Sequence, residues 1–122
     1  MNPIVKHMLN ESRLDVAFQA LADPARRAML ARLAMGPASV SELARPLPMS
    51  LPAVMQHLKA LEDSGLVSTK KQGRVRTAQL EGDTLSVAER WLKDRRTEWE
   101  AQADRLEAFL ETYQDKENEH GR

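Results

Sequence analysis

Apolar residues recur at helical spacing near the middle of the chain, in residues 50–65. Ser50 can cap the first turn of this predicted helix, because its hydroxyl can accept a hydrogen bond from a free backbone N–H. Pro52 fits the same turn, where its missing N–H is not needed. Gly65 predicts the end of the helix, since glycine readily takes a left-handed conformation. The three- and four-residue spacing predicts one buried face, made of Leu51, Val54, Leu58 and Leu61.

The segments on either side of this helix complete a known motif. Residues 41–47 predict a shorter helix, which Pro46 shortens or distorts at its end. Residues 66–80 predict two strands joined by the turn Lys71-Gln72-Gly73-Arg74, in which Gly73 supplies the positive φ. A short helix, a tight turn, a capped helix and a basic hairpin together predict a winged helix-turn-helix.

Two helices and a short strand are predicted before this motif. Residues 1–11 have weak periodicity and are expected to be a frayed arm, after which Ser12 and Asp15 resemble a capping box. Asp23, followed by proline, predicts the start of a second helix that runs to about residue 34. The residues expected to point inward from it are Ala28, Leu30 and Leu33.

Residues 38–40 could form a short strand that pairs with the hairpin. The following helix could be capped by Ser39 or by Ser41. The spacing from Ser39 to Glu42 favours Ser39, because it matches a capping box.

From Asp83 the sequence predicts one long helix, with no glycine or proline before Gly121. A helix of about 30 residues extends roughly 45 Å, which is longer than a small domain can cover. Its apolar positions form a heptad-like seam, interrupted by Arg95 and Gln102. An exposed seam is a liability in a monomer, so we expect an identical chain to cover it. The alternative is that the helix folds back on its own domain. The expected dimer-interface residues are Leu85, Ala88, Leu92, Trp99, Leu106 and Phe109.

These patterns predict a mainly α fold with a small β-hairpin: a winged helix-turn-helix followed by a long C-terminal dimerisation helix. The expected layout is an arm at 1–11, a DNA-binding domain at 12–82, the dimerisation helix at 83–117 and a disordered tail at 118–122. The length of 122 residues fits one such domain.

Composition excludes several classes of function. The chain has no cysteine, which excludes disulfides and thiolate metal sites. No apolar run approaches the roughly 20 residues of a membrane span, and the N-terminus is too short and polar for a secretory signal, so a cytoplasmic location is expected. The three histidines are far apart and no phosphate loop or nucleophile elbow is present, so we expect no enzyme activity.

Charge adds a pointer to a partner. The formal net charge is zero, which alone argues against non-specific nucleic-acid binding. Residues 64–80, however, contain four cations and no acidic residue. A run of this kind can be merely a solvated hairpin. Beside a helix-turn-helix, it favours contact with DNA.

The chain resembles the ArsR family of bacterial winged-helix repressors over roughly residues 14–92. The segments that carry the resemblance are DPARRAMLARL (23–33), SELA (41–44), SLPAVMQHLKALEDSGLV (50–67) and QGRVRTAQL (72–80). The resemblance implies dimerisation through terminal helices. The family's cysteine-pair site has no cysteine here, and its Asp/His site on the last helix has no histidine within residues 83–113. The chain therefore resembles a cysteine-less, metal-independent branch; no metal or cofactor is expected, and whether a small-molecule effector exists stays open.

The resemblance also implies how double-stranded DNA would be bound. The helix at 50–64 would enter the major groove, where Gln56 can read adenine and Met55 can pack on a thymine methyl group. The hairpin would reach the backbone or the neighbouring minor groove. A two-fold dimer implies an inverted-repeat operator, and repression is the expected output. The candidate DNA-binding residues are Ser50, Pro52, Ala53, Met55, Gln56, His57, Lys59, Lys71, Gln72, Arg74 and Arg76.

Two alternatives remain open. A winged helix can also act as a protein-interaction adaptor, with the long C-terminal helix as its docking element. A regulator of the PadR or MarR type would also combine a winged helix with dimerising helices. The basic hairpin argues against the adaptor, and the single long terminal helix fits the ArsR pattern better.

Overall fold

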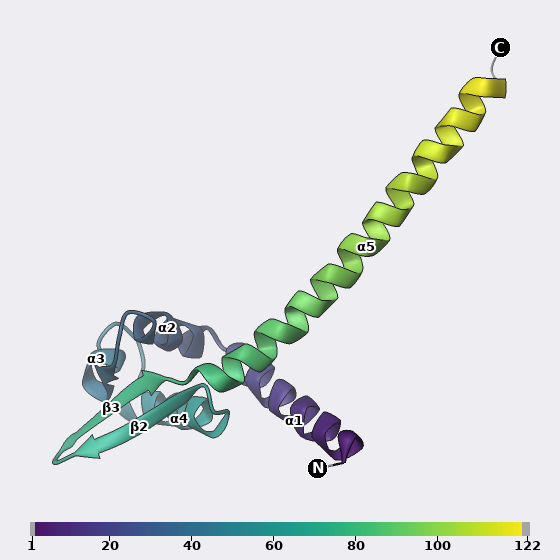
Figure 1. The fold of residues 1–122 in the computed structure, drawn as a ribbon. Coiled ribbons are helices and arrows are strands. Elements are labelled where there is room, and N and C mark those ends of the chain that lie inside the picture. Colours follow the sequence, from purple (N-terminus) through teal and green to yellow (C-terminus); the bar gives the residue numbers. More distant parts are fainter. Residues whose placement is uncertain (1, 121–122) are drawn as a thin grey trace. The chain divides into compact units, whose positions relative to one another are not determined.

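The computed structural model describes residues 2–120 and confirms a mainly helical fold with a small antiparallel sheet (Figure 1). Contacts divide the chain into two units, Met1–Ala88 and Glu89–Arg122, and each is described by itself. The elements in chain order are α1 (Pro3–Leu21), α2 (Pro24–Leu33), β1 (Ala38–Ser39), α3 (Val40–Ala44), α4 (Leu51–Asp63), β2 (Val67–Gln72), β3 (Val75–Leu80) and α5 (Gly82–His120).

Three helix starts predicted from capping side chains are confirmed, those of α2, α3 and α4. Asp23 Oδ1 accepts hydrogen bonds from the backbone N–H groups of Ala25 at 2.8 Å and Arg26 at 3.2 Å. Ser39 Oγ accepts from the Glu42 N–H at 3.2 Å and donates to Glu42 Oε1 at 3.2 Å, and both bonds belong to the start of α3. Ser50 Oγ accepts from the Ala53 N–H at 3.3 Å. The helix-turn-helix is therefore positioned by short local interactions that the sequence specifies.

Replacing Asp23 with alanine should lower the free energy of unfolding at pH 7, because two N–H groups of α2 lose their acceptor. The hydrogen bond from the Arg26 N–H is the main cause that holds the pKa of the Asp23 carboxyl below its ordinary value of 3.8. Because the pKa of this carboxyl is lowered on folding, its ionised form stabilises the folded state at pH values above 3.8. That stabilisation is lost as the pH falls through the pKa of the folded state. Urea unfolding of the wild type and of Asp23→Ala at pH 7 and pH 3 measures the loss. The difference in unfolding free energy between the two proteins should shrink at pH 3, and a larger difference there would contradict the capping role. Asp23→Asn, which keeps a capping oxygen, is the control.

The core of the first unit lies around α4. Val54, Leu58 and Leu61 are buried along one face of that helix. They belong to one hydrophobic cluster with residues from α1, α2, α3 and the sheet, including Ala20, Met29, Leu33, Leu43, Leu66, Val67 and Ala78. Burial of this face fixes which side of α4 remains at the surface.

The sheet has the strand order β1-β3-β2. The predicted pairing of the 38–40 segment with the hairpin is confirmed, with Ala38 opposite Ala78 and Ser39 opposite Thr77. The hairpin turn lies one residue later than predicted, because Gln72 still pairs with Val75 and only two residues remain between the strands. Gly73, the first of these, has a φ of 61°. Glycine at this position supplies the backbone twist that a two-residue hairpin turn needs.

Gly65 ends α4 as predicted, and it also lies close to Thr84. Its φ is 80°, which is the left-handed region. A Cβ atom at this position would lie 2.5 Å from the Thr84 hydroxyl oxygen, in the first turn of α5. Thr84 is itself buried. Glycine is therefore required here both by backbone conformation and by space.

Four predictions about helix positions were wrong. α1 begins at Pro3 rather than at Ser12, because Asn2 caps it by accepting from the Ile4 N–H at 2.9 Å; residues 3–11 are helical, and the predicted capping box lies inside the helix. Ala28 is exposed and its neighbour Met29 is buried, so the inward face of α2 is rotated. Leu51 is 56% exposed, because it lies in the first turn of α4, before the helix enters the core. α5 continues to His120 through the predicted tail; the remainder of that tail, 121–122, lies outside the described residues.

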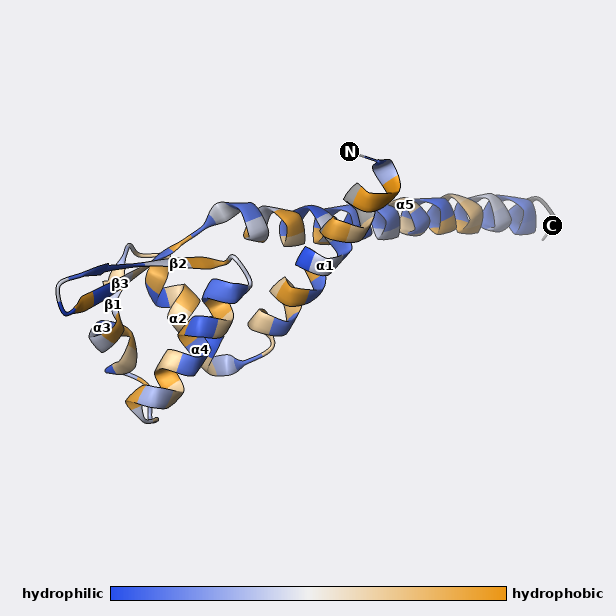
Figure 2. Cartoon of the chain, turned by 90° about the horizontal axis from the view of Figure 1, so that it is seen from below, coloured by the Kyte–Doolittle hydropathy of each residue, from blue (hydrophilic) through white to orange (hydrophobic). Residues whose placement is uncertain are grey.

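The second unit is the greater part of α5, whose apolar residues recur among hydrophilic ones along its length (Figure 2). Leu92, Trp99, Leu106 and Phe109 are all at least half exposed. The polar seam residue Arg95 pairs with Glu98 at 2.7 Å, and its guanidinium carbon lies 5.1 Å from the centroid of the Trp91 ring. Ala88, which was also predicted to lie at the interface, is instead buried within the first unit.

Candidate nucleic-acid interface

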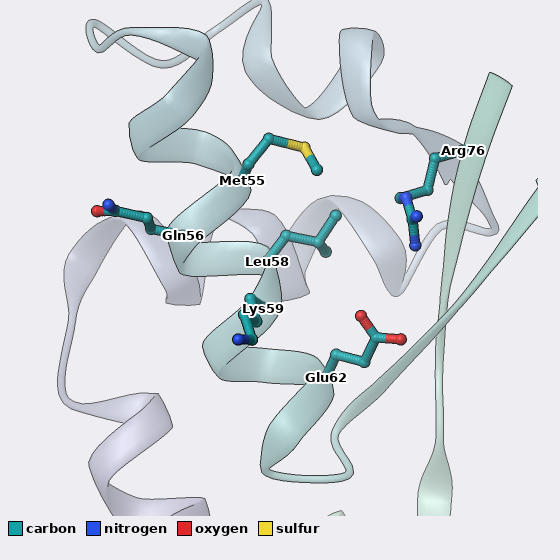
Figure 3. A pocket seen from close by; sticks show the side chains of 6 residues that line it. All are labelled: Met55, Gln56, Leu58, Lys59, Glu62 and Arg76. Carbon is teal, nitrogen blue, oxygen red and sulfur yellow. The ribbon is translucent and has the colours of Figure 1, made fainter. Parts of the chain in front are cut away.

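The face of α4 opposite the core carries the candidate base-reading residues. Met55, Gln56 and Lys59 are exposed there, while Leu58 between them is buried. Figure 3 shows the side chain of Met55 on the side of the helix nearer the hairpin and that of Gln56 on the opposite side. The structure therefore brings these residues together on one helix, with their side chains spread across its surface.

A groove of about 380 Å³ separates α4 from β3. Arg76 projects from β3 into it, facing Leu58 and Glu62 (Figure 3). Arg76 Nη1 donates to Thr69 Oγ1 at 2.9 Å, and the same hydroxyl donates to Glu62 Oε1 at 3.0 Å. Arg76 is half-buried, so this network links the hairpin to α4 and leaves Arg76 less free than the cations at the hairpin tip.

The hairpin tip is exposed and positively charged. Lys71, Gln72 and Arg74 are all exposed. Within the part of the chain that the structure describes, neither Lys71 nor Arg74 forms an ion pair with a carboxylate. Lys71 also lies directly opposite Arg76 in the β2–β3 pairing, and like charges at such positions are destabilising. Stability of the hairpin does not explain this arrangement, whereas a polyanionic partner does.

His57 lies apart from the other candidate residues. Its Nδ1 accepts a hydrogen bond from Arg26 Nε at 3.2 Å and lies 3.9 Å from Asp23 Oδ1. The side chain is 22% exposed and borders a separate hollow beside the start of α2. His57 therefore joins α4 to α2, and we leave it out of the DNA-facing group.

Comparison with known proteins agrees with this geometry. Residues 21–69 match a family described as a helix-turn-helix domain. The chain is 55% identical over 73 residues to the HTH-type transcriptional regulator Rv2034 of Mycobacterium tuberculosis, which covers 60% of this chain and 68% of that protein. The structure of an ArsR family transcriptional regulator, RHA00566, is 52% identical, with a TM-score of 0.71 over 74% of this chain and 93% of that one. The chain belongs to the ArsR family of transcriptional regulators.

An ArsR-like transcriptional regulator from Rhodococcus sp. RHA1 has the same TM-score of 0.71 at 33% identity, over 83% of this chain and 93% of that one. The predicted family and the winged helix-turn-helix fold are thus confirmed. Transcriptional regulators of this class act on DNA through the helix-turn-helix, which in this ArsR chain is α3, the following turn and α4.

Among the side chains that the structure describes, no three of the His, Asp or Glu residues gather in an arrangement that could hold a metal ion. Within the same residues, no helix combines the length and apolar character needed to cross a bilayer.

The sequence did not reveal several contacts in this ArsR chain. The bonds that join Arg26 to His57, and Arg76 to Thr69 and Glu62, connect different elements, so no local pattern announces them. The start of α1 did have a signal, because Asn2 before a proline repeats the pattern of Asp23 before Pro24. Leu51 and Val75 also border the interface and were not predicted to do so.

Proposed function

We propose that this chain is a sequence-specific repressor that binds an inverted-repeat operator as a homodimer. In this proposal α4 enters the major groove and the β2–β3 wing lies on the backbone or in the adjacent minor groove. The observation that carries it is the exposed, uncompensated charge of Lys71 and Arg74 on the wing beside the exposed face of α4. Phosphate contacts supply most of the affinity of such proteins, and base contacts supply the specificity.

Individual roles follow from exposure and position. The first turn of α4, from Ser50 through Pro52 and Ala53, would approach a phosphate, to which the Ser50 hydroxyl would donate, aided by the helix dipole; the Ala53 N–H is already bonded to Ser50 Oγ. Gln56 is exposed and would bond to adenine through its amide, while Lys59 would contact phosphate. The residues proposed to contact DNA are Ser50, Pro52, Ala53, Met55, Gln56, Lys59, Lys71, Gln72 and Arg74, with Arg76 in a supporting position between wing and helix.

The homodimer is proposed from the exposed seam of α5. A helix with Trp99 at 69% and Phe109 at 64% exposure needs an apolar partner surface, and a second copy of the same seam provides one. Two helix-turn-helix units related by a two-fold axis read two half-sites about one helical turn apart. A dimer bound over a promoter would exclude polymerase, which is the basis for proposing repression.

Fluorescence anisotropy would test the proposal. The full-length protein is titrated into a duplex from upstream of its own coding sequence and into a scrambled duplex of the same composition, across a salt series. Preference for the upstream duplex, with affinity that falls steeply with salt, is the expected result. Equal, weak binding to both duplexes would contradict specific binding at that site and favour the protein-adaptor function.

Arg74→Ala should reduce affinity for both duplexes by a similar factor and lower the slope of log affinity against log salt by about 1, because one phosphate contact is lost. The salt series measures this directly. Arg90→Ala is the matched control, since Arg90 is exposed on α5, on the side away from the seam. An unchanged slope in Arg74→Ala would show that the wing does not contact phosphate.

A further inference from the structure

Three exposed apolar side chains gather in a second groove, which is lined by the start of α4, the wing and residues 39–41. Leu51 is 56% exposed, Met55 38% and Val75 53%. They line a groove of about 460 Å³ together with the cations Lys71, Arg74 and Arg76. Phosphate binding explains the cations. It does not explain why aliphatic side chains are exposed between them.

The fold does not require an apolar residue at position 51. The hydrophobic residues that secure the start of α4 are Met49, just before the Ser50 cap, and Val54, one turn into the helix, which is the arrangement of a hydrophobic staple. Val54 belongs to the core cluster and Met49 packs against it, whereas Leu51 belongs to neither set. Its aliphatic side chain is therefore free to contact a partner.

We propose that Leu51 and Met55 form a methyl-reading pair that selects thymine at two nearby positions of each operator half-site. This inference rests on the proposed function and names a specificity determinant within it. Thymine is the only DNA base with a methyl group in the major groove, and apolar side chains recognise it by direct contact. Helix residues near the N-terminus of a recognition helix are the ones that reach base edges.

The spacing of the pair fits this role. Residues four apart on a helix have Cβ atoms about 5–6 Å apart, on the same face. Successive base pairs rise by about 3.4 Å, so the two side chains span one to two base-pair steps. Met55 also lines the neighbouring groove with Gln56 and Lys59, which makes the apolar strip continuous with the proposed base-reading face.

The test uses deoxyuridine, which differs from thymidine only by the missing methyl group. A preferred duplex is first selected from a library with a random core, using the full-length protein. Each thymine in it is then replaced by deoxyuridine, one at a time. We expect about fourfold weaker binding at two positions of each half-site, within one or two steps of each other, and no change elsewhere, since one buried methyl-sized group contributes about 0.8 kcal/mol.

Protein variants assign each methyl group to a side chain. Leu51→Ala should abolish the sensitivity to deoxyuridine at one of the two positions, and Met55→Ala at the other. Met35→Ala is the matched control, because Met35 is 83% exposed but does not line the groove, and it should keep both sensitivities. If circular dichroism shows that Leu51→Ala folds poorly, Leu51→Gln is used in its place, because glutamine is a good helix former and also lacks the aliphatic end of leucine.

The outcomes separate the inference from the function on which it rests. A library that yields no enriched sequence overturns specific DNA binding, and the methyl-reading pair with it. An enriched sequence that tolerates deoxyuridine at every position overturns the pair alone. Sensitivity that persists in both Leu51→Ala and Met55→Ala overturns the assignment to these residues and leaves the proposed repressor intact.

Discussion

Replacing Trp99 with glutamate should convert the proposed dimer to a monomer and weaken operator binding by on the order of 10²–10⁴-fold. Trp99 occupies the middle of the α5 seam and is 69% exposed in the single chain. A carboxylate there would be buried without a partner when two seams meet, which is strongly unfavourable. The loss of affinity follows because two linked half-site contacts become independent ones. Light scattering gives the oligomeric state and anisotropy gives the affinity.

The matched control for this substitution is Thr97→Glu. It introduces the same charge two residues away, on the opposite side of α5 from the seam. This variant should remain a dimer with nearly unchanged affinity. If Trp99→Glu also remains a dimer, the seam assignment is wrong and the interface lies elsewhere in the chain.

Gly65→Ala should lower the free energy of unfolding by roughly 2–6 kcal/mol. A non-glycine residue at a φ of 80° costs about 1–3 kcal/mol in backbone strain. The added Cβ would also lie 2.5 Å from Thr84 Oγ1, so the buried Thr84 side chain must rotate or the backbone around it must shift, at a further cost of about 1–3 kcal/mol. Chemical denaturation monitored by circular dichroism measures the total.

Gly73→Ala separates the two causes. Gly73 also has a positive φ, of 61°, but nothing lies within 4 Å of a Cβ added there. This variant should show the conformational cost without the steric one and be clearly less destabilised. Combining Gly65→Ala with Thr84→Ala should recover part of the loss. Equal destabilisation by the two glycine variants would contradict a steric role for Thr84.

Local chemistry made much of the fold predictable from sequence. Asp23, Ser39 and Ser50 each satisfy backbone groups within three residues of themselves, so the signal for each helix start lies in a few adjacent letters. The signals at Gly65 and Gly73 are equally local, because the positive φ at each position favours glycine there. The three-four periodicity of α4 predicted its buried face except at Leu51, in its first turn.

Interactions between elements set the limit of sequence-based prediction. His57 is among the DNA-binding candidates from sequence, and the structure shows that its Nδ1 accepts a hydrogen bond from Arg26, 31 residues earlier in the chain. Arg76 was expected at the wing surface, yet it donates to Thr69 across the hairpin. Ala88 carries the seam periodicity, yet it is buried in the first unit. Each of these positions depends on which surfaces meet in three dimensions, and spacing alone does not contain that information.

The pairing of Lys71 opposite Arg76 also has a dynamic consequence for the wing. Repulsion between the two cations lowers the local opening free energy of the hairpin in the free protein. A polyanion bound along the wing removes that repulsion, so binding and hairpin closure reinforce each other. Backbone amides of β2 and β3 near the tip should therefore exchange with solvent deuterium quickly in the free protein and slowly in the complex. The wing would act as an element that becomes fully ordered only on its target.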